Sequence, residues 1–293
     1  MANLAALRPA ALTKRRRSLR RPGDVLFLAF IYAGSALSAF LCLSPFLHTI
    51  AVAFSGDAAI AGGKVGLWPV DFQTDAMRSV LTDASVLRAL GVSVGVTAGG
   101  TAFNLLLTVM TAYPLSRRDF RARGAFMNYM IVTMLFSGGM IPAYLLIRHL
   151  GLYNTVWSMI LPGAISVINV IIMKTFFQEL PEELREAAVV DGCGNTRYLF
   201  NVVLPLSGAT LAAVGLLYAV GHWNSYFTAM LYVDNAQLHT LQVKLRNLLM
   251  LSRLDRESFE AAAIVFAAAP ILFVLPFLHK YAIKGSLLGS IKS

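Results

Sequence analysis

Six long segments of this chain contain no Asp, Glu, Lys or Arg, and they set the strongest limit on how it can fold. They cover residues 25–54, 89–116, 124–147, 149–173, 198–233 and 261–279. A helix needs about 20 predominantly apolar residues to cross the hydrocarbon core of a bilayer. The pattern therefore predicts six transmembrane helices, near residues 26–54, 89–113, 125–147, 155–176, 207–232 and 261–281.

Composition agrees with a membrane protein. Hydrophobic residues make up 57% of the chain and charged residues 14%, and the mean hydropathy is +0.66. A typical soluble domain has about 25% charged residues. We predict an all-α polytopic membrane protein with one membrane domain at 25–283, a basic segment at 1–24 and a tail at 284–293. Once the spans are counted, little length remains for a soluble enzymatic domain.

The basic residues predict the orientation of the spans. Lys and Arg gather before residue 22, at 117–123, at 174–197 and at 280–292, whereas the loops on the other side contain as many acidic as basic residues. The whole net charge of +10 thus lies on one side, and positive flanks mark the cytoplasmic side. Both termini are expected in the cytoplasm. The basic start of the chain fits membrane topology better than nucleic-acid binding.

A polar segment at 179–205 interrupts the apolar pattern between the fourth and fifth spans. Pro181 suits a first helical turn, and the two glutamates after it meet the positive end of the helix dipole. Gly192 can adopt a positive φ and end this helix after Asp191. Asn195 can cap a second helix, which Pro205 would stop. We predict a helix–turn–helix on the cytoplasmic side.

The spacing within this segment resembles the EAA loop of permease subunits in bacterial ABC importers. Two further features resemble the carbohydrate-uptake branch of these importers: Asp191 before the glycine, and His222-Trp223-Asn224 in the next span. Within that branch, the chain resembles the smaller maltose-importer permease and permeases for alginate or another complex polysaccharide. The matching residues of the loop are Glu186, Ala187, Ala188, Gly192, Val202, Leu204 and Pro205.

The resemblance implies a maltose-importer-like permease fold in the bacterial inner membrane, with a defined set of partners. They are a second homologous permease, two copies of a cytosolic ATPase that binds ATP and Mg, and an extracytoplasmic solute-binding protein. Glu186 would be the polar anchor of the loop on the ATPase, Ala187 and Ala188 would allow close approach, and Gly192 would set the angle between its helices. The tail resembles the glycine-punctuated tail of the maltose-type permease, with Ser293 in place of its final glycine.

Missing motifs narrow the function further. The chain has no G-x-x-x-x-G-K-[ST] loop for nucleotide phosphates, no metal motif and no recognisable catalytic pairing. We expect no catalytic residue, cofactor or metal in this chain, with ATP hydrolysis on the partner. An ion-coupled transporter or channel is disfavoured because such proteins place ionisable groups at membrane depth. That class and a membrane-bound enzyme or scaffold remain the alternatives.

A polar and aromatic cluster in the fifth span is the candidate for the substrate pathway. Amides and aromatic faces suit the hydroxyls and C–H patches of a sugar, although the same residues can pack between membrane helices. Asn104 and Asn169 carry the same two interpretations. The glycine pair at 138–139 with Pro142 predicts a break in the third span. The cluster consists of His222, Trp223, Asn224, Tyr226 and Phe227.

Overall fold

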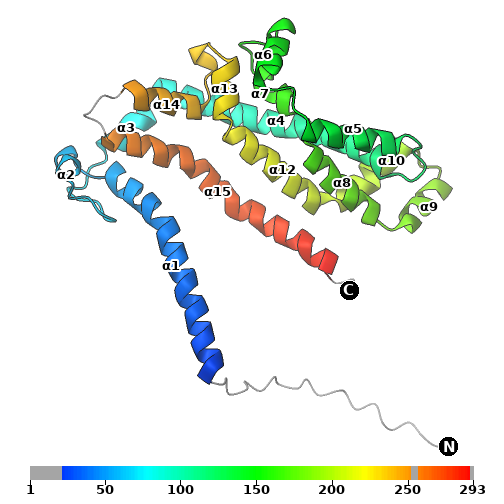
Figure 1. Cartoon of the computed structure of the whole chain (residues 1–293), viewed down its shortest axis with the longest axis horizontal. Helices are drawn as coiled ribbons and strands as arrows, with labels where there is room; N and C mark the ends of the chain where they lie inside the picture. Colours follow the sequence, from blue (N-terminus) through cyan, green and yellow to red (C-terminus); the bar gives the residue numbers. More distant parts are fainter. Residues whose placement is uncertain (1–21, 252–256, 291–293) are drawn as a thin grey trace, which may run out of the picture. The chain divides into compact units, whose positions relative to one another are not determined.

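The structure, a computed structural model, describes residues 22–251 and 257–290, with the side chains of the last helix described as far as Phe273. Every regular element in these ranges is a helix, and the β contact found there is an isolated antiparallel bridge between Ser55 and Phe72 (Figure 1). The chain divides into two units, residues 1–48 and 49–293. The all-α prediction is confirmed.

The described part of the first unit is one apolar helix, α1 (Pro22–Ala53), which continues into the second unit after His48. Residues Val25–Ala53 form a candidate span of 29 residues. Apolar side chains such as Leu26 and Phe30 are exposed along it, as expected for a helix surrounded by lipid or by other membrane helices. The basic residues that precede α1 in the sequence lie outside the described residues.

The second unit is organised around three helices that pack along one another. The long straight helix α4 (Ala84–Ser116) packs against α8 (Val167–Glu179) and α12 (Gly208–Trp223). On another side of α12 lies α15 (Glu257–Ser290), which also packs against α3 (Asp75–Thr82). The core shared by the first three helices includes Val109, Ala112, Leu115, Val170, Met173, Val214 and Tyr218.

The third predicted span is sharply broken. Helices α5 (Arg123–Leu135) and α6 (Met140–His149) meet at 113°, and Gly139 between them has φ +88°. Glycine adopts this conformation without the clash that a Cβ would cause. Pro142 lies in the first turn of α6, where its missing N–H breaks no helical hydrogen bond. The predicted break is confirmed, and segment 125–147 forms two separate helices.

Two more spans are bent pairs. The short α7 (Trp157–Ile160) with the 3-10 turn η1 (Leu161–Gly163) leads into α8 at 58°, and the segment Asn195–Leu206 leads into α12 at 82°. The described residues thus contain two candidate spans that are single helices and three bent pairs. The sixth predicted span falls on α15, where the side chains beyond Phe273 lie outside the described residues. The polytopic architecture agrees with the apolar segments of the sequence.

The fifth predicted span is shorter than expected. Helix α12 ends at Trp223, and α13 (Tyr226–Tyr232) starts as a separate helix. Both the backbone N–H and the side-chain amide of Asn224 donate to the carbonyl of Val220. An asparagine side chain that takes a backbone acceptor in this way competes with helix continuation, which accounts for the interruption.

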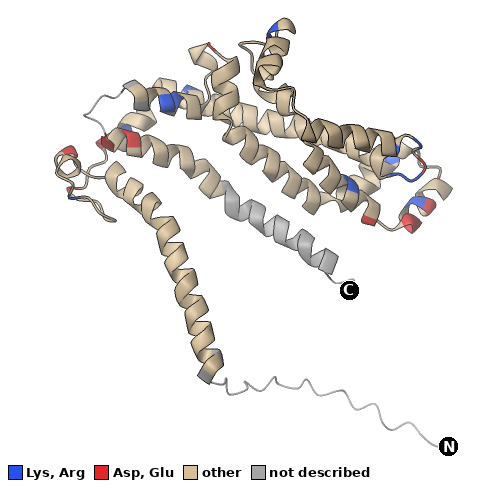
Figure 2. Cartoon of the chain, in the orientation of Figure 1, with Lys and Arg blue, Asp and Glu red and all other residues tan. Residues whose placement is uncertain are grey.

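Short helices connect the spans. They are α2 (Asp57–Ala61), α9 (Glu182–Val190), α10 (Asn195–Tyr198), the π-helix η2 (Leu199–Val203), α11 (Leu204–Leu206), η3 (Ala236–Leu238) and α14 (Leu241–Leu251). Within the second unit, α3 and α14 lie near the start of α4, and α9 and α10 lie near its end (Figure 1). Most charged residues lie near helix ends and in connections (Figure 2).

Candidate functional site

The polar segment at 179–205 contains a well-defined short helix. Pro181 occupies the N-cap position, and α9 begins at Glu182, one residue later than predicted. Glu182 and Glu183 lie in the first turn, where the positive end of the helix dipole stabilises a carboxylate. The predicted helix and its acidic start are therefore present, with proline just outside the helix.

Gly192 ends α9 as predicted. Its φ is +70°, and its N–H donates to the carbonyl of Val189 at 3.0 Å while the N–H of Cys193 donates to the carbonyl of Ala188 at 2.8 Å. These two bonds form a Schellman motif, which satisfies carbonyls left free at a helix end. Cys193 and Ala188 both pack against the core near α4 and α8, so the turn is anchored to the spans.

The two sides of α9 differ in their surroundings. Arg185 and Ala188 are half-buried toward the protein, whereas Glu186, Ala187 and Asp191 are exposed. The exposed side also carries three apolar side chains: Leu184 is 38% exposed, Val189 58% and Val190 87%. Exposed apolar side chains on a polar helix can form part of a partner interface. Of the two predicted alanines, Ala187 belongs to this surface and Ala188 to the side that packs on the spans.

The second half of the loop differs in detail from the prediction. The N-cap of α10 is Gly194, without a side-chain capping bond, so the prediction that Asn195 caps this helix was wrong. The helix continues as the π-helix η2 and as α11 and ends at Leu206, so the prediction that Pro205 stops it was also wrong. Val202 and Leu204 pack against the core, while Pro205 is exposed. A π-helix shifts the hydrogen-bond register, and such insertions are frequent at functional sites.

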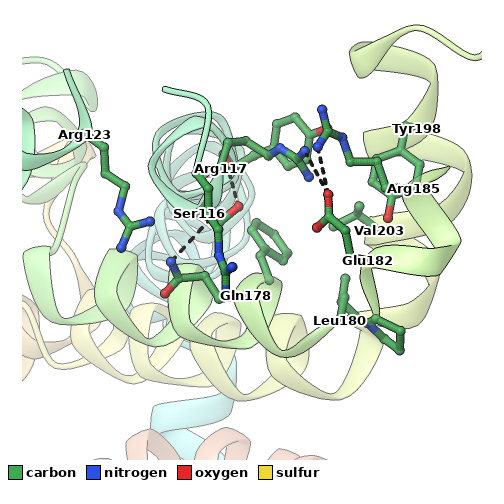
Figure 3. A pocket seen from close by; sticks show the side chains of 13 residues that line it. Ser116, Arg117, Arg123, Gln178, Leu180, Glu182, Arg185, Tyr198 and Val203 are labelled. Atoms are coloured by element: carbon green, nitrogen blue, oxygen red, sulfur yellow. Dashed lines mark hydrogen bonds and ion pairs between the residues drawn. The ribbon is translucent and has the colours of Figure 1, made fainter. Parts of the chain in front are cut away.

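Four charged side chains connect α9 to the segment that follows α4. Arg185 donates from Nη1 to Glu182 Oε1 at 2.8 Å and from Nη2 to Asp119 Oδ2 at 3.3 Å. Arg117 contacts the same two carboxylates, 3.6 Å from Asp119 Oδ1 and 3.7 Å from Glu182 Oε1, and Figure 3 draws its contact with Glu182. The hydrogen bond that Arg185 donates to Glu182 raises the pKa of the Arg185 guanidinium. A network of this kind holds geometry better than one exposed ion pair, which contributes about 0–1 kcal/mol.

A cavity of about 630 Å³ opens beside this network. Its walls are the end of α4, the first residue of α5, the end of α8 and the start of α9, and Figure 3 shows the side chains that line it. Gln178 closes one side by donating to the carbonyl of Ser116 at 3.4 Å. Tyr198 lies against it from α10, and burial raises the pKa of its phenol. The cavity is polar and strongly basic, with four arginines, Arg117, Arg118, Arg123 and Arg185, in its lining.

A second recess, of about 390 Å³, lies between α4, α12 and the break before α8. Asn104 is 1% exposed there, with Nδ2 2.9 Å from His222 Nε2 and 3.4 Å from the carbonyl of Gly163. Gly100 makes room for the imidazole, since a Cβ at this position would lie 2.7 Å from His222 Nε2. Within the described residues, Asn104 Oδ1 has no hydrogen-bond partner.

One helical turn along, a second set of hydrogen bonds joins the same three elements. Thr108 Oγ1 lies 2.7 Å from the hydroxyl of Tyr218, which also accepts the backbone N–H of Ser166 at 3.1 Å. The break before α8 is thereby held by polar side chains of both neighbouring helices, as non-helical backbone at membrane depth requires. With Asn169, the recess offers neutral amide, imidazole and hydroxyl groups, which can bind a hydroxylated solute or hold the helices together.

The predicted cluster at 222–227 is divided among different surroundings. His222 lines the recess, whereas Trp223 is buried in another core with residues of α3 and α14. Asn224 is exposed at the end of α12. The hydroxyl of Tyr226 lies 2.7 Å from Met230 Sδ, and its ring lies below Arg246. Phe227 is 53% exposed. The five residues thus do not form one surface.

Some residues of both sites were not selected from the sequence. The spacing of Glu182 and Arg185 is that of an i,i+3 pair and signals their contact, but nothing local links either residue to Asp119. Tyr218 and Ser166 carry no sequence signal beyond being polar within an apolar segment. Among the described residues, no group of three or more His, Cys, Asp and Glu side chains is placed to hold a metal ion.

Comparisons with known proteins test the family resemblance. Residues 9–285 match the family described as binding-protein-dependent transport system inner membrane component. The chain is 40% identical over 281 residues to the polygalacturonan/rhamnogalacturonan transport system permease protein YtcP of Bacillus subtilis, covering 91% of this chain and 98% of that protein. It is also 40% identical over 282 residues to protein LplC of the same organism, covering 92% and 93%.

A solved structure has the same fold. The chain superposes with a TM-score of 0.85 and 29% identity on a chain from a bacterial ABC transporter involved in the import of the acidic polysaccharide alginate, covering 89% of this chain and 98% of the other. The resemblance that the sequence suggested is therefore confirmed, both for the family and for the fold.

Proposed function

Because this chain belongs to the family of binding-protein-dependent transport system inner membrane components, and is a multi-pass permease subunit of a carbohydrate ABC importer, we propose that the 179–205 loop couples it to a separate ATPase. In this proposal α9 inserts its exposed side into the ATPase, with Glu186 and Asp191 at the edge of the contact. Gly192 sets the turn after α9, and Val202, Leu204 and Pro205 belong to the half of the loop that joins the fifth span.

The single observation that carries this proposal is the two-sided character of α9. Its inner side is fixed to the spans by ion pairs and by Ala188, while Val189 and Val190 are 58% and 87% exposed on an otherwise polar surface. Exposed valines on a helix that its own chain holds firmly offer apolar surface that a partner can bury. A cytosolic ATPase that closes on binding ATP and Mg would move this helix as one body with its anchors.

For the substrate we propose an oligomer derived from a complex polysaccharide, of the kind that includes alginate. Support comes from the relatives, since one is named for polygalacturonan and rhamnogalacturonan and another for the acidic polysaccharide alginate. The recess around Asn104 and His222 adds neutral hydrogen-bonding groups at membrane depth, which suit sugar hydroxyls. Of the predicted cluster, we propose that His222 lines the substrate pathway. Trp223, Asn224, Tyr226 and Phe227 would support the helices around it.

The proposed assembly contains a second, homologous permease, two ATPase copies and an extracytoplasmic solute-binding protein. Both termini would be cytoplasmic, with segment 1–24 before the membrane domain 25–283 and the tail 284–293 after it. The side chains of that tail lie outside the described residues. This chain would contribute no catalytic residue, and ATP hydrolysis would take place on the partner.

ATPase activity in proteoliposomes tests the coupling. The tagged chain is purified with its native partners and reconstituted with the solute-binding protein and candidate oligosaccharides. Val190→Asp places a charge in the proposed contact and should abolish sugar-stimulated hydrolysis. Thr196→Asp adds the same charge at an exposed position outside α9 and should leave stimulation unchanged. Purification without an ATPase, or uptake driven by an ion gradient alone, would refute the proposal.

A further inference from the structure

The cavity beside α9 has an excess of positive charge that the protein itself does not neutralise. Four arginines line it, against a single carboxylate, that of Glu182. Arg117 and Arg185 share Glu182 and Asp119. Within the described part of the chain, no acidic side chain lies within 4.0 Å of the other two, Arg118 and Arg123. An anion that enters this cavity would therefore meet unpaired guanidinium groups.

The groups in the cavity suit a phosphoryl anion. A guanidinium presents two parallel N–H donors, which match two oxygens of one phosphate. Arg123 is also the first residue of α5, a helix of 13 residues with no side-chain cap at its start and no acidic residue in its first turn. Its free N–H groups and dipole add to the attraction. The volume of about 630 Å³ is ample for a phosphoryl group and the alcohol attached to it.

The surroundings of the cavity indicate where this phosphoryl group comes from. Along α5, Phe126 and Tyr129 follow Arg123 after about one and two turns, and they are 55% and 67% exposed. Both side chains lie on the exposed side of α5 within the predicted third span, which is where the acyl chains of a lipid would lie. A free phosphate has the same charged group but gains nothing from that surface.

We propose that the cavity binds the headgroup phosphate of an anionic phospholipid from the inner leaflet, through Arg118 and Arg123, with the acyl chains along α5. This proposal relies on the cytoplasmic orientation proposed above. The same cavity is walled by Arg117 and Arg185, the two residues that hold Glu182 of α9. The bound lipid therefore lies at the joint between the spans and the loop, in contact with the residues that fix the position of α9.

Lipid retention by the purified, assembled transporter tests the site directly. The protein is exchanged into a neutral detergent with equal amounts of phosphatidylglycerol and phosphatidylcholine, and the lipids that remain bound after washing are quantified by mass spectrometry. The wild type should prefer phosphatidylglycerol, and Arg118→Gln/Arg123→Gln should lower that preference about tenfold. Arg118→Lys/Arg123→Lys retains both charges and should keep most of the preference, which separates loss of charge from loss of folding.

A matched control separates this cavity from general attraction to a basic surface. Arg121 and Arg197 are exposed in the same region and do not line the cavity, so Arg121→Gln/Arg197→Gln removes the same charge and should keep the wild-type preference. An equal loss in both double variants, or no loss in either, would overturn the site. If inorganic phosphate alone stabilises the wild type but not Arg118→Gln/Arg123→Gln, while lipid preference is unchanged, the phosphoryl site stands and the lipid is refuted.

The outcome does not depend on the coupling proposal. Lipid retention is measured without ATP, so a chain that fails the ATPase assay can still pass this one. Labelling of an introduced Thr196→Cys, in a variant whose native cysteines are replaced (Cys42→Ser/Cys193→Ser), by a membrane-impermeant thiol reagent applied to either side of sealed vesicles tests the orientation separately. Labelling from the extracytoplasmic side would place the cavity at the wrong leaflet and overturn the proposal.

Discussion

Replacing Gly192 by alanine isolates the turn that ends α9 from every other feature of the loop. A Cβ at this position meets no heavy atom within 4 Å, so the substitution causes no clash. Its φ of +70° remains unfavourable for alanine, and the left-handed conformation costs about 1–2 kcal/mol in a residue with a Cβ. That free energy corresponds to about a 5–30-fold rise in the population of the opened turn.

Hydrogen exchange at the amide of Cys193 measures this opening, because its N–H closes the turn by donating to Ala188 at 2.8 Å. The protection of this amide should fall about 5–30-fold in Gly192→Ala. Gly194 provides the matched control: it also lies in open space, but its φ is −72°, which alanine adopts freely. Equal loss of protection in Gly194→Ala, or full protection in Gly192→Ala, would refute the conformational argument.

Two further predictions concern α4. Gly100→Ala places a Cβ 2.7 Å from His222 Nε2 and should destabilise the protein by about 1–3 kcal/mol. The loss should be measured as a lower unfolding midpoint in detergent. Gly99→Ala is the control and should leave the midpoint unchanged, because Gly99 has open space around it. Asp83 caps α4, and the hydrogen bond with the hydroxyl of Ser85 lowers the pKa of the Asp83 carboxyl group. The ionised carboxylate therefore stabilises the folded state, and Asp83→Ala should lower the free energy of unfolding by about 1 kcal/mol at neutral pH. This difference between the wild type and the variant should shrink as the pH falls below about 4. A difference between the two proteins that is independent of pH would contradict the assignment to the carboxylate.

The apolar segments and the end of α9 could be predicted because both depend on local chemistry. A run of some 20 apolar residues fits a bilayer whatever surrounds it, and a glycine after an amphipathic helix is the residue that tolerates a positive φ. The break at Gly139 was predictable for the same reason, but its angle of 113° was not. How far two helices diverge is set by what each packs against after the break.

The polar contacts were unpredictable because their partners lie far apart in the sequence. Asn104 and His222 are 118 residues apart, and Arg185 and Asp119 are 66 residues apart. No local pattern specifies such pairs. The apparent cluster at 222–227 was misleading for a related reason: α12 ends within it, so His222 and Phe227 belong to different helices and point into different surroundings.

The anchoring of α9 limits how it can move. Its inner side is attached at Arg185 to Asp119, just after α4, and at Cys193 and Ala188 to the core between α4 and α8. A displacement of α9 must therefore either break both attachments or carry the end of α4 with it. Helix α4 also carries Asn104 and Thr108, which hold the break before α8. Rigid packing between α4 and its neighbours then places the membrane recess and the exposed side of α9 on one connected body. Under the proposed coupling, a partner that moves Val189 and Val190 would therefore act on the polar recess through α4.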